Sequence, residues 1–513
     1  MKRAFLAFLL MFSVSVTLFF STFHVQPVRG QATIYIRANG SVDPSSTPII
    51  QDGNLYTLTS DINAEIVIER DNITLDGSNH LLQGNNPPSG IGITISERTS
   101  VTIKNMRIEN FSAGIRCLNS SSNDVFIGNS LMNNYNGIIM DCPGVVDFPH
   151  STWAKAHDIT IANNTLANNG VGISISYPYQ DPTGNNQITG NSVKNNSNGI
   201  IIQYGSNNTV SRNTIEANSH LGIELGGSAD NSISENSICD NDVGISTWAT
   251  QDYAGLWLSS GNIITGNDIV QNNIGFFRDP SFYPLDGVSL VYHNNFIGNV
   301  VQTDVYSGSV NAWDNGYEGN YWSDYAGTDS KQDGIGDTAY DIDEDNTDHY
   351  PLMGTFQSFN VSITPQNLGE VDAISNFTIS DLGLYEWLST PNQYLQAGQP
   401  FLRLAPVQEQ NMTAGFCRMT LPNNVLNTSE YIVLVNMTPI IVNKLAISND
   451  THTTLYFTFN TSAIEGIITV PEFPSFLIPL LSMIAILLVV AINKRKCSCT
   501  RSRLDSGSRV LAP

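Results

Sequence analysis

The sequence predicts an all-β protein, made of a right-handed parallel β-helix, a β-sandwich-like domain and one C-terminal transmembrane helix. A glycine followed by a large apolar residue returns at intervals with a base length of about 22 residues, which is typical of a solenoid. Short segments of alternating apolar residues fill each interval, without helical periodicity. Near the C-terminus, residues 473–492 contain no charged side chain.

The repeat predicts three strands in each rung of the β-helix. Apolar residues stand one position after each glycine, and six and eleven before it, as in Ile115, Ile108 and Ile103, with a one-residue shift of the last two columns in the rung of Gly222. Three segments this short fit three strands that point β-branched side chains inward, and stacked rungs then form three parallel sheets. Parallel crossovers are nearly always right-handed. The repeat glycines are Gly114, Gly137, Gly172, Gly199, Gly222, Gly244 and Gly275.

Two columns of polar residues predict the bends between the strands. Asparagine tolerates a left-handed backbone and can bond its counterpart one rung away, so we assign both columns a structural role and no chemistry. The column eight residues before the glycine contains Asn129, Asn164, Asn191, Asn236 and Asn267, and the rung of Gly222, shifted by one residue, contributes Asn213. The column four residues before it contains Asn110, Asn133, Asn168, Asn195, Asp240 and Gln271.

The two ends of the chain predict export and anchoring at the cell surface. Lys2 and Arg3 precede an apolar run, as in a signal peptide. A run of about 20 uncharged residues spans a bilayer, and the basic residues after it are expected to stay in the cytoplasm. The predicted segments are a signal peptide at 1–30, an N-terminal cap at 31–60, the β-helix at 61–325, an acidic closing segment at 326–354, the sandwich-like domain at 355–469, the transmembrane helix at 473–492 and a cytoplasmic tail at 493–513.

Composition restricts the class of partner. The net charge of −23 argues against nucleic acid, because affinity for phosphate backbones comes from Lys and Arg. Asn-x-Ser/Thr acceptors, among them Asn110 and Asn360, predict a glycoprotein.

Three segments carry a resemblance to a known family. The stretch 34–43 resembles the opening strand of NosD-type surface β-helices, and 319–325 with 350–353 resembles their closing segment. The resemblance covers 34–353 and implies a β-helix of the carbohydrate-binding and sugar-hydrolase superfamily. It also implies a link to copper, but the Met, His and Cys residues here are scattered, so we expect no copper site. The tripeptide 471–473 resembles an archaeal surface-sorting signal.

Extra residues inserted at one corner of the β-helix predict the position of the ligand site. Every longer interval places its extra residues after the strand that begins at the glycine, and such extra length stacks along one side of a solenoid. We predict a saddle between the insertions at 177–184 and 248–258. Aromatic rings stack on sugar faces while polar groups bind hydroxyls, so the expected ligand is a polysaccharide or glycan. An alternative is that these aromatics only pack the loops onto the sheet. The predicted ligand-binding residues are Tyr177, Tyr179, Gln203, Tyr204, Trp248, Tyr253 and Trp257.

A catalytic hypothesis stands beside the binding one. A polysaccharide lyase, hydrolase or epimerase needs an acid and a base, and hydrolysis needs two carboxylates about 5 to 10 Å apart. The candidates are Asp181, Glu224, Asp252 and His150. The run 147–150 is similar to the Asp-Pro-His-Asp motif of alginate epimerases but lacks its final Asp, so we favour a non-catalytic surface protein. A purely architectural envelope component is the third class.

One acidic loop is similar to a calcium-binding loop. Asp329, Asp333, Ile335 and Asp337 stand at ligand positions one, five, seven and nine, with the turn glycine at position six. Lys331 occupies position three, where an acidic residue is usual. Calcium is therefore the one cofactor we predict, and a solvated acidic turn is the alternative.

Overall fold

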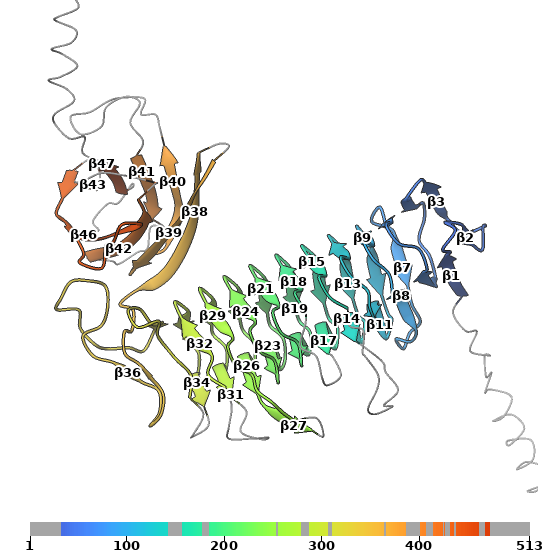
Figure 1. Ribbon diagram of the computed structural model, residues 1–513, viewed down its shortest axis with the longest axis horizontal. Helices are drawn as coiled ribbons and strands as arrows, with labels where there is room; N and C mark the ends of the chain where they lie inside the picture. The colour runs from blue at the N-terminus through green and yellow to red at the C-terminus, as the bar shows by residue number, and fades with distance from the viewer. Residues whose placement is uncertain are drawn as a thin grey trace, which may run out of the picture. The chain divides into compact units, whose positions relative to one another are not determined.

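The computed structural model describes residues 32–141, 156–176, 184–252, 255–278, 287–305, 310–363, 366–385, 401–406, 414–423, 425, 431–435, 438–460 and 467–471. The chain divides into two compact units, Met1–Pro178 and Tyr179–Pro513. Both contain stacked rungs of parallel strands (Figure 1). The predicted signal peptide, transmembrane helix and basic tail lie outside the described residues. Within the described ranges, no helix is both long enough and apolar enough to cross a membrane.

The first unit contains three sheets, to each of which every complete rung adds one strand, and they are parallel except for one antiparallel strand at the edge of the first sheet and one at the edge of the second. Its first sheet comprises β2 (Val42–Asp43), β1 (Ala32–Ile36), β5 (Ala64–Ile68), β8 (Ile91–Ser96), β11 (Ala113–Leu118), β14 (Asn136–Asp141) and β17 (Val171–Ser176). Its second sheet comprises β3 (Ile49–Asp52), β4 (Leu55–Leu58), β6 (Thr74–Asp76), β9 (Thr102–Lys104), β12 (Val125–Ile127) and β15 (Thr160–Ala162). Its third sheet comprises β7 (Leu81–Gln83), β10 (Arg107–Glu109), β13 (Ser130–Met132) and β16 (Thr165–Ala167).

The second unit repeats this arrangement. Its first sheet comprises β20 (Asn198–Gln203), β23 (Leu221–Gly226), β26 (Val243–Trp248), β31 (Ile274–Arg278) and β34 (Val301–Val305). Its second sheet comprises β18 (Gln187–Thr189), β21 (Thr209–Ser211), β24 (Ser232–Ser234), β29 (Ile263–Thr265) and β32 (Leu290–Tyr292). Its third sheet comprises β19 (Ser192–Lys194), β22 (Thr214–Glu216), β25 (Ser237–Cys239), β30 (Asp268–Val270), β33 (Asn295–Ile297) and β35 (Tyr321–Trp322). Two hairpins stand apart, β27 (Thr250–Asp252) with β28 (Gly255–Trp257), and β36 (Tyr340–Asp341) with β37 (Thr347–Asp348).

The predicted aliphatic columns form the core of the β-helix. Ile115, Ile138 and Ile173 are register partners on β11, β14 and β17, and all three side chains are fully buried. The repeat glycine is required because neighbouring rungs approach closely there. A Cβ on Gly114 would lie 2.7 Å from the carbonyl oxygen of Gly137. The prediction of three inward-facing strands per rung is therefore confirmed.

The predicted asparagine column forms a hydrogen-bonded ladder. In the second unit, Asn213 is buried, and its Nδ2 donates to Asn236 Oδ1 at 3.0 Å and to the carbonyl oxygen of Ile188 at 2.9 Å. Bonding from rung to rung is thus confirmed. The left-handed backbone, however, belongs to the residue before the ladder asparagine, such as Arg212 with a φ of 56°. Our assignment of that conformation to the ladder itself was wrong, because its side chain must point inward to reach the next rung.

The C-terminal strands form two five-stranded antiparallel sheets around one core. Buried side chains such as Val371, Met419 and Leu455 fill the space between them. One sheet comprises β38 (Thr355–Ile363), β39 (Gln366–Ser375), β42 (Ala414–Pro422), β46 (His452–Asn460) and β45 (Val442–Lys444). The other comprises β40 (Ile379–Tyr385), β41 (Phe401–Pro406), β47 (Ile467–Pro471), β43 (Tyr431–Val435) and β44 (Thr438–Ile440).

Buried polar contacts join this sandwich to the last rungs within the second unit. The carboxamide of Asn295 on β33 donates to the carbonyl of Phe356 at 2.9 Å and accepts from its N–H at 2.8 Å. Arg418 on β42 forms an ion pair with Glu318, which also bonds His293 at 2.7 Å. Burial alone would raise the pKa of Glu318, but the hydrogen bond from His293 and the charge of Arg418 lower that pKa to about 2.

The carboxyl group of Asp124 allows the burial of polar groups inside the β-helix to be tested. Its carboxyl is fully buried and accepts from the N–H of Val101 at 2.8 Å, as a ladder asparagine would. Burial raises its pKa to about 7 despite that hydrogen bond. Because the folded-state pKa exceeds the ordinary aspartate value of 3.8, the native state loses stability as the pH rises from about 4 to 7.

We therefore expect Asp124→Asn to raise the free energy of unfolding at pH 8 by roughly 2 to 4 kcal/mol, with little effect at pH 4. Urea unfolding at both pH values measures this difference. The exposed Asp52→Asn serves as the control and should change neither value. Equal effects of Asp124→Asn at both pH values would contradict the prediction.

Candidate functional site

Four of the predicted ligand-binding and catalytic residues lie together on the first sheet of the second unit. Gln203 ends β20, and its register partner on β23 is Gly226, which in turn pairs with Trp248 on β26. A Cβ on Gly226 would lie 2.2 Å from Trp248 Cζ2. The glycine therefore lets the indole lie across the neighbouring strand. We call Gln203, Tyr204, Glu224 and Trp248 the sheet-end cluster.

A polar pair forms one half of the sheet-end cluster. Gln203 Nε2 donates to Glu224 Oε1 at 2.8 Å. Glu224 points away from the core because its neighbours on β23, Ile223 and Leu225, point into it, yet only 8% of Glu224 is exposed. The hydrogen bond fixes the orientation of the amide, whose Oε1 accepts no hydrogen bond from the described residues. A nearly buried carboxylate and a partly exposed amide therefore stand side by side.

An aromatic pair forms the other half. The rings of Tyr204 and Trp248 meet edge to face, with centroids 6.3 Å apart and an interplanar angle of 89°. Tyr204 has a φ of 56°, and its N–H donates to the carbonyl oxygen of Gly226 at 2.9 Å. A left-handed backbone at a bulky residue costs of order 1 kcal/mol or more. Amide, carboxylate and aromatic groups of this kind suit a sugar ligand.

The rest of the predicted saddle stays a prediction. Tyr177, Tyr179 and Tyr253 lie outside the described residues, as do the catalytic candidates Asp181 and His150. For Asp252 and Trp257 the structure describes only the backbone, in the antiparallel hairpin of β27 with β28. Of the four catalytic candidates, Glu224 alone has a described side chain.

The acidic loop satisfies its carboxylates internally. Asp329 accepts from the N–H groups of Asp333 and Gly334 at 3.0 and 2.9 Å. Asp337 accepts from the N–H of Ser330 at 2.6 Å and lies 3.6 Å from Lys331 Nζ, so the lysine at position three neutralises a predicted ligand. Gly334 has the expected left-handed φ of 81°. The loop has the predicted turn, while calcium binding remains a prediction.

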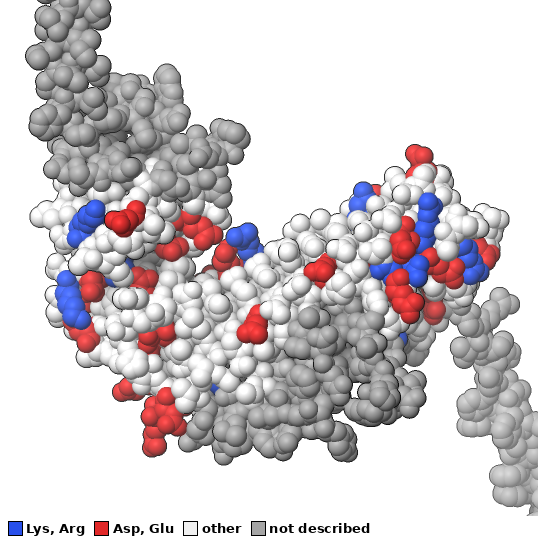
Figure 2. Space-filling model, in the orientation of Figure 1, with Lys and Arg blue, Asp and Glu red and all other residues white. Residues whose placement is uncertain are grey.

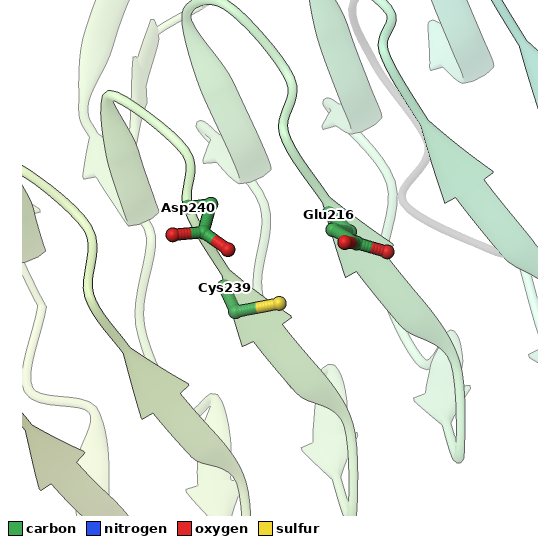
Figure 3. Close-up of side chains that lie close together, drawn as sticks. All are labelled: Glu216, Cys239 and Asp240. Atoms are coloured by element: carbon green, nitrogen blue, oxygen red, sulfur yellow. The ribbon is translucent and has the colours of Figure 1, made fainter.

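Sequence reasoning missed one group of potential metal ligands. Glu216, Cys239 and Asp240 place one ligand atom each within 4.8 Å of one another, the only such group of His, Cys, Asp or Glu within the described ranges (Figure 3). Glu216 and Cys239 are register partners on β22 and β25. The repeat length could have revealed this group, because residues that are one repeat apart in the sequence become neighbours on adjacent rungs. Burial, together with the charges of Glu216 and Asp240, raises the pKa of the Cys239 thiol, so the thiol is protonated at neutral pH.

This donor set does not fit copper. Cu(I) prefers thiolate and thioether ligands, and Cu(II) prefers imidazole in a tetragonal site. The group offers one thiol, two carboxylates and no imidazole.

Charge is distributed unevenly over the surface. On the face drawn in Figure 2, charged side chains gather over the first rungs and over the sandwich, and few lie between them. The repeats between these regions expose asparagines such as Asn163 and Asn207 and also acidic residues such as Asp230 and Asp240. The exposed side chains there are therefore a mixture of uncharged hydrogen-bonding groups and carboxylates.

Two family models match the β-helix. The model described as "Periplasmic copper-binding protein (NosD)" matches residues 150–254 and 247–327, and the one described as "Right handed beta helix region" matches residues 57–200. Proteins named "Probable ABC transporter binding protein NosD" from Stutzerimonas stutzeri and Pseudomonas aeruginosa are 44% and 46% identical over 55 residues. Each match covers 11% of this chain and only 12% or 13% of the relative.

Similar solved structures include two epimerases. The A-module of the Azotobacter vinelandii mannuronan C-5 epimerase AlgE4 is 16% identical, with a TM-score of 0.35 over 54% of this chain and 87% of that one. The periplasmic alginate epimerase AlgG is 15% identical, with a TM-score of 0.39 over 52% of this chain and 78% of that one.

Proposed function

Since this chain contains a NosD-type right-handed parallel β-helix, we propose that it is a non-catalytic carbohydrate-binding protein of the cell surface. The observation that supports this most is the sheet-end cluster. There the bonded pair Gln203 and Glu224 lies on the same strand ends as the aromatic pair of Tyr204 and Trp248.

The polar pair and the aromatic pair would contact different parts of a sugar. The rings of Tyr204 and Trp248 are both partly exposed, and aromatic rings stack on apolar sugar C–H groups. Gln203 offers an oriented Oε1 to a hydroxyl, and Glu224 holds the amide in place. Because Glu224 is nearly buried, its removal would release the amide rather than delete a sugar contact.

The surface location is part of the same proposal. The basic and apolar start of the chain suits export, and the uncharged run at 473–492 followed by basic residues suits a single-pass anchor with a cytoplasmic C-terminus. The glycan acceptors and the Pro-Glu-Phe tripeptide suit an archaeal surface glycoprotein. The partners we propose are a polysaccharide or glycan and, through the anchor, the membrane.

A polysaccharide lyase, hydrolase or epimerase is the second candidate function. Glu224 supports it as a nearly buried carboxylate on an otherwise polar strand end. Its required partner would come from Asp181, Asp252 or His150. The two functions differ in their products, because a binding protein leaves the polysaccharide unchanged.

Binding of a panel of polysaccharides, measured by glycan array and calorimetry, tests the first proposal. We expect Trp248→Ala to weaken binding about tenfold or more, since a lost aromatic contact costs roughly 1.5 kcal/mol. Tyr317→Ala, which removes an aromatic that is 67% exposed elsewhere, should leave affinity unchanged. Equal affinity of the Trp248 variant would exclude this site. Unsaturated, shortened or epimerised products that disappear in Glu224→Gln would establish the enzyme instead.

Calcium is a separate proposal, resting on the turn at Gly334 and the spacing of Asp329, Asp333, Ile335 and Asp337. At about 5 mM calcium we expect the melting temperature to rise by a few degrees, as for a site of about millimolar affinity. Asp337→Asn should abolish the rise, and the exposed Asp450→Asn should keep it. A melting temperature independent of calcium would show a solvated turn.

A further inference from the structure

A groove runs along the bends that join the third sheet to the first sheet in the first unit. Its volume is about 680 Å³. Three successive rungs contribute Asn110 with Ser112, then Asn133 with Tyr135, then Asn168 with Gly170. The loop between β7 and β8 adds Asn86 and Pro88. None of the residues of the sheet-end cluster takes part.

Tyr135 is the one aromatic residue of the groove, and 69% of it is exposed. Its backbone is held by both neighbouring rungs, because its N–H donates to the carbonyl of Phe111 and its own carbonyl accepts from Val171, both at 2.9 Å. The equivalent positions on those rungs are Ser112 and Gly170, where no large side chain covers the ring. A Cβ on Gly170 would lie 3.6 Å from Tyr135 Cδ2. The tyrosine thus has a fixed backbone and stands between two small neighbours.

Three carboxamides accompany the ring along the rungs. Asn110, Asn133 and Asn168 share a left-handed backbone, with φ values of 64°, 57° and 56°. Their side chains make no hydrogen bond within the described part of the chain. The residues that follow two of them behave differently, since Asn134 and Asn169 are buried and bonded to each other at 3.1 Å. Successive rungs lie about 4.8 Å apart, so the open carboxamides form a row.

The described residues that line the groove include no charged side chain, in a chain whose net charge is −23. Carboxamides donate and accept, and therefore match neighbouring sugar hydroxyls, which do the same. An aromatic face matches the apolar face of a sugar ring. A uronate or a phosphate would find no cation here, and a cationic ligand would find no carboxylate.

We propose that this groove binds a neutral saccharide chain, with Tyr135 stacked on one sugar ring and Asn133 and Asn168 bonded to hydroxyls. The site goes beyond the proposed function, because it uses different residues in the other compact unit. The chain would then hold carbohydrate at two places with different requirements, one with a carboxylate nearby and one without charge.

The experiment uses the full chain, produced in detergent from a host without N-glycosylation, because Asn110-Phe111-Ser112 is itself a glycan acceptor. The probes are neutral hexasaccharides of glucose, mannose and xylose, with hexamers of alginate and polygalacturonate as acidic counterparts. Calorimetry measures affinity. We expect at least one neutral probe to bind, and Tyr135→Ala to weaken that binding about tenfold.

Matched variants separate this site from the sheet-end cluster and from misfolding. Asn133→Asp changes one amide into a carboxylate of equal size and should weaken neutral probes severalfold. Tyr317→Ala should leave their affinity unchanged, and unaltered melting temperatures should show that all variants fold. The inference is overturned if no neutral probe binds at millimolar concentration, if Tyr135→Ala binds like the parent chain, or if Trp248→Ala alone removes binding.

Discussion

The stacking of asparagine side chains inside the bends is the interaction on which the rest of the structure depends. A bend inside a solenoid buries backbone groups that no strand partner satisfies, and an unpaired buried group costs about 1 to 3 kcal/mol. Each ladder asparagine bonds the backbone of one neighbouring rung and the side chain of the next, as Asn236 does with Val210 and Asn267. The ladder therefore aligns the rungs whatever the length of the loops between them. Asn129 and Asn164 pair although they are 35 residues apart, while Asn191 and Asn213 pair across 22.

This alignment explains where chemistry can occur. Outward positions on the short strands often carry Ser or Thr, as Ser211 and Ser234 do. The candidate sites stand where one rung departs from the column, as Trp248 does opposite Gly226 and Tyr135 does between Ser112 and Gly170. A large side chain beside a small one creates a raised and a recessed region on an otherwise flat sheet surface. Binding surface on this fold therefore comes from single exceptions to the repeat.

The repeat could be predicted from the sequence because inward positions obey a strict period. The burial of Ile115 and Ile138 can be predicted from their apolar side chains and their spacing. The burial of the ladder asparagines can be predicted from their spacing. The groove at Tyr135 could not be predicted in this way. An exposed tyrosine and an exposed asparagine have no period of their own, and their availability depends on what the neighbouring rungs place beside them. The open column with Asn133 was taken as purely structural for the same reason, and the closeness of Glu216 to Cys239 became visible only once the register was known.

Pairs of introduced cysteines test most directly whether the rungs stack in the register described above. Ser211 and Ser234 are outward register partners on adjacent strands, about 4.8 Å apart, and Thr265 lies one rung further. In a chain with Cys239→Ser, mild oxidation should join cysteines at 211 and 234, because a disulfide spans Cα separations of about 4.4 to 6.8 Å. Cysteines at 211 and 265, about 9.6 Å apart, should stay reduced. Equal crosslinking of both pairs, or of the distant pair alone, would contradict the stacked rungs and the two proposed sites with them.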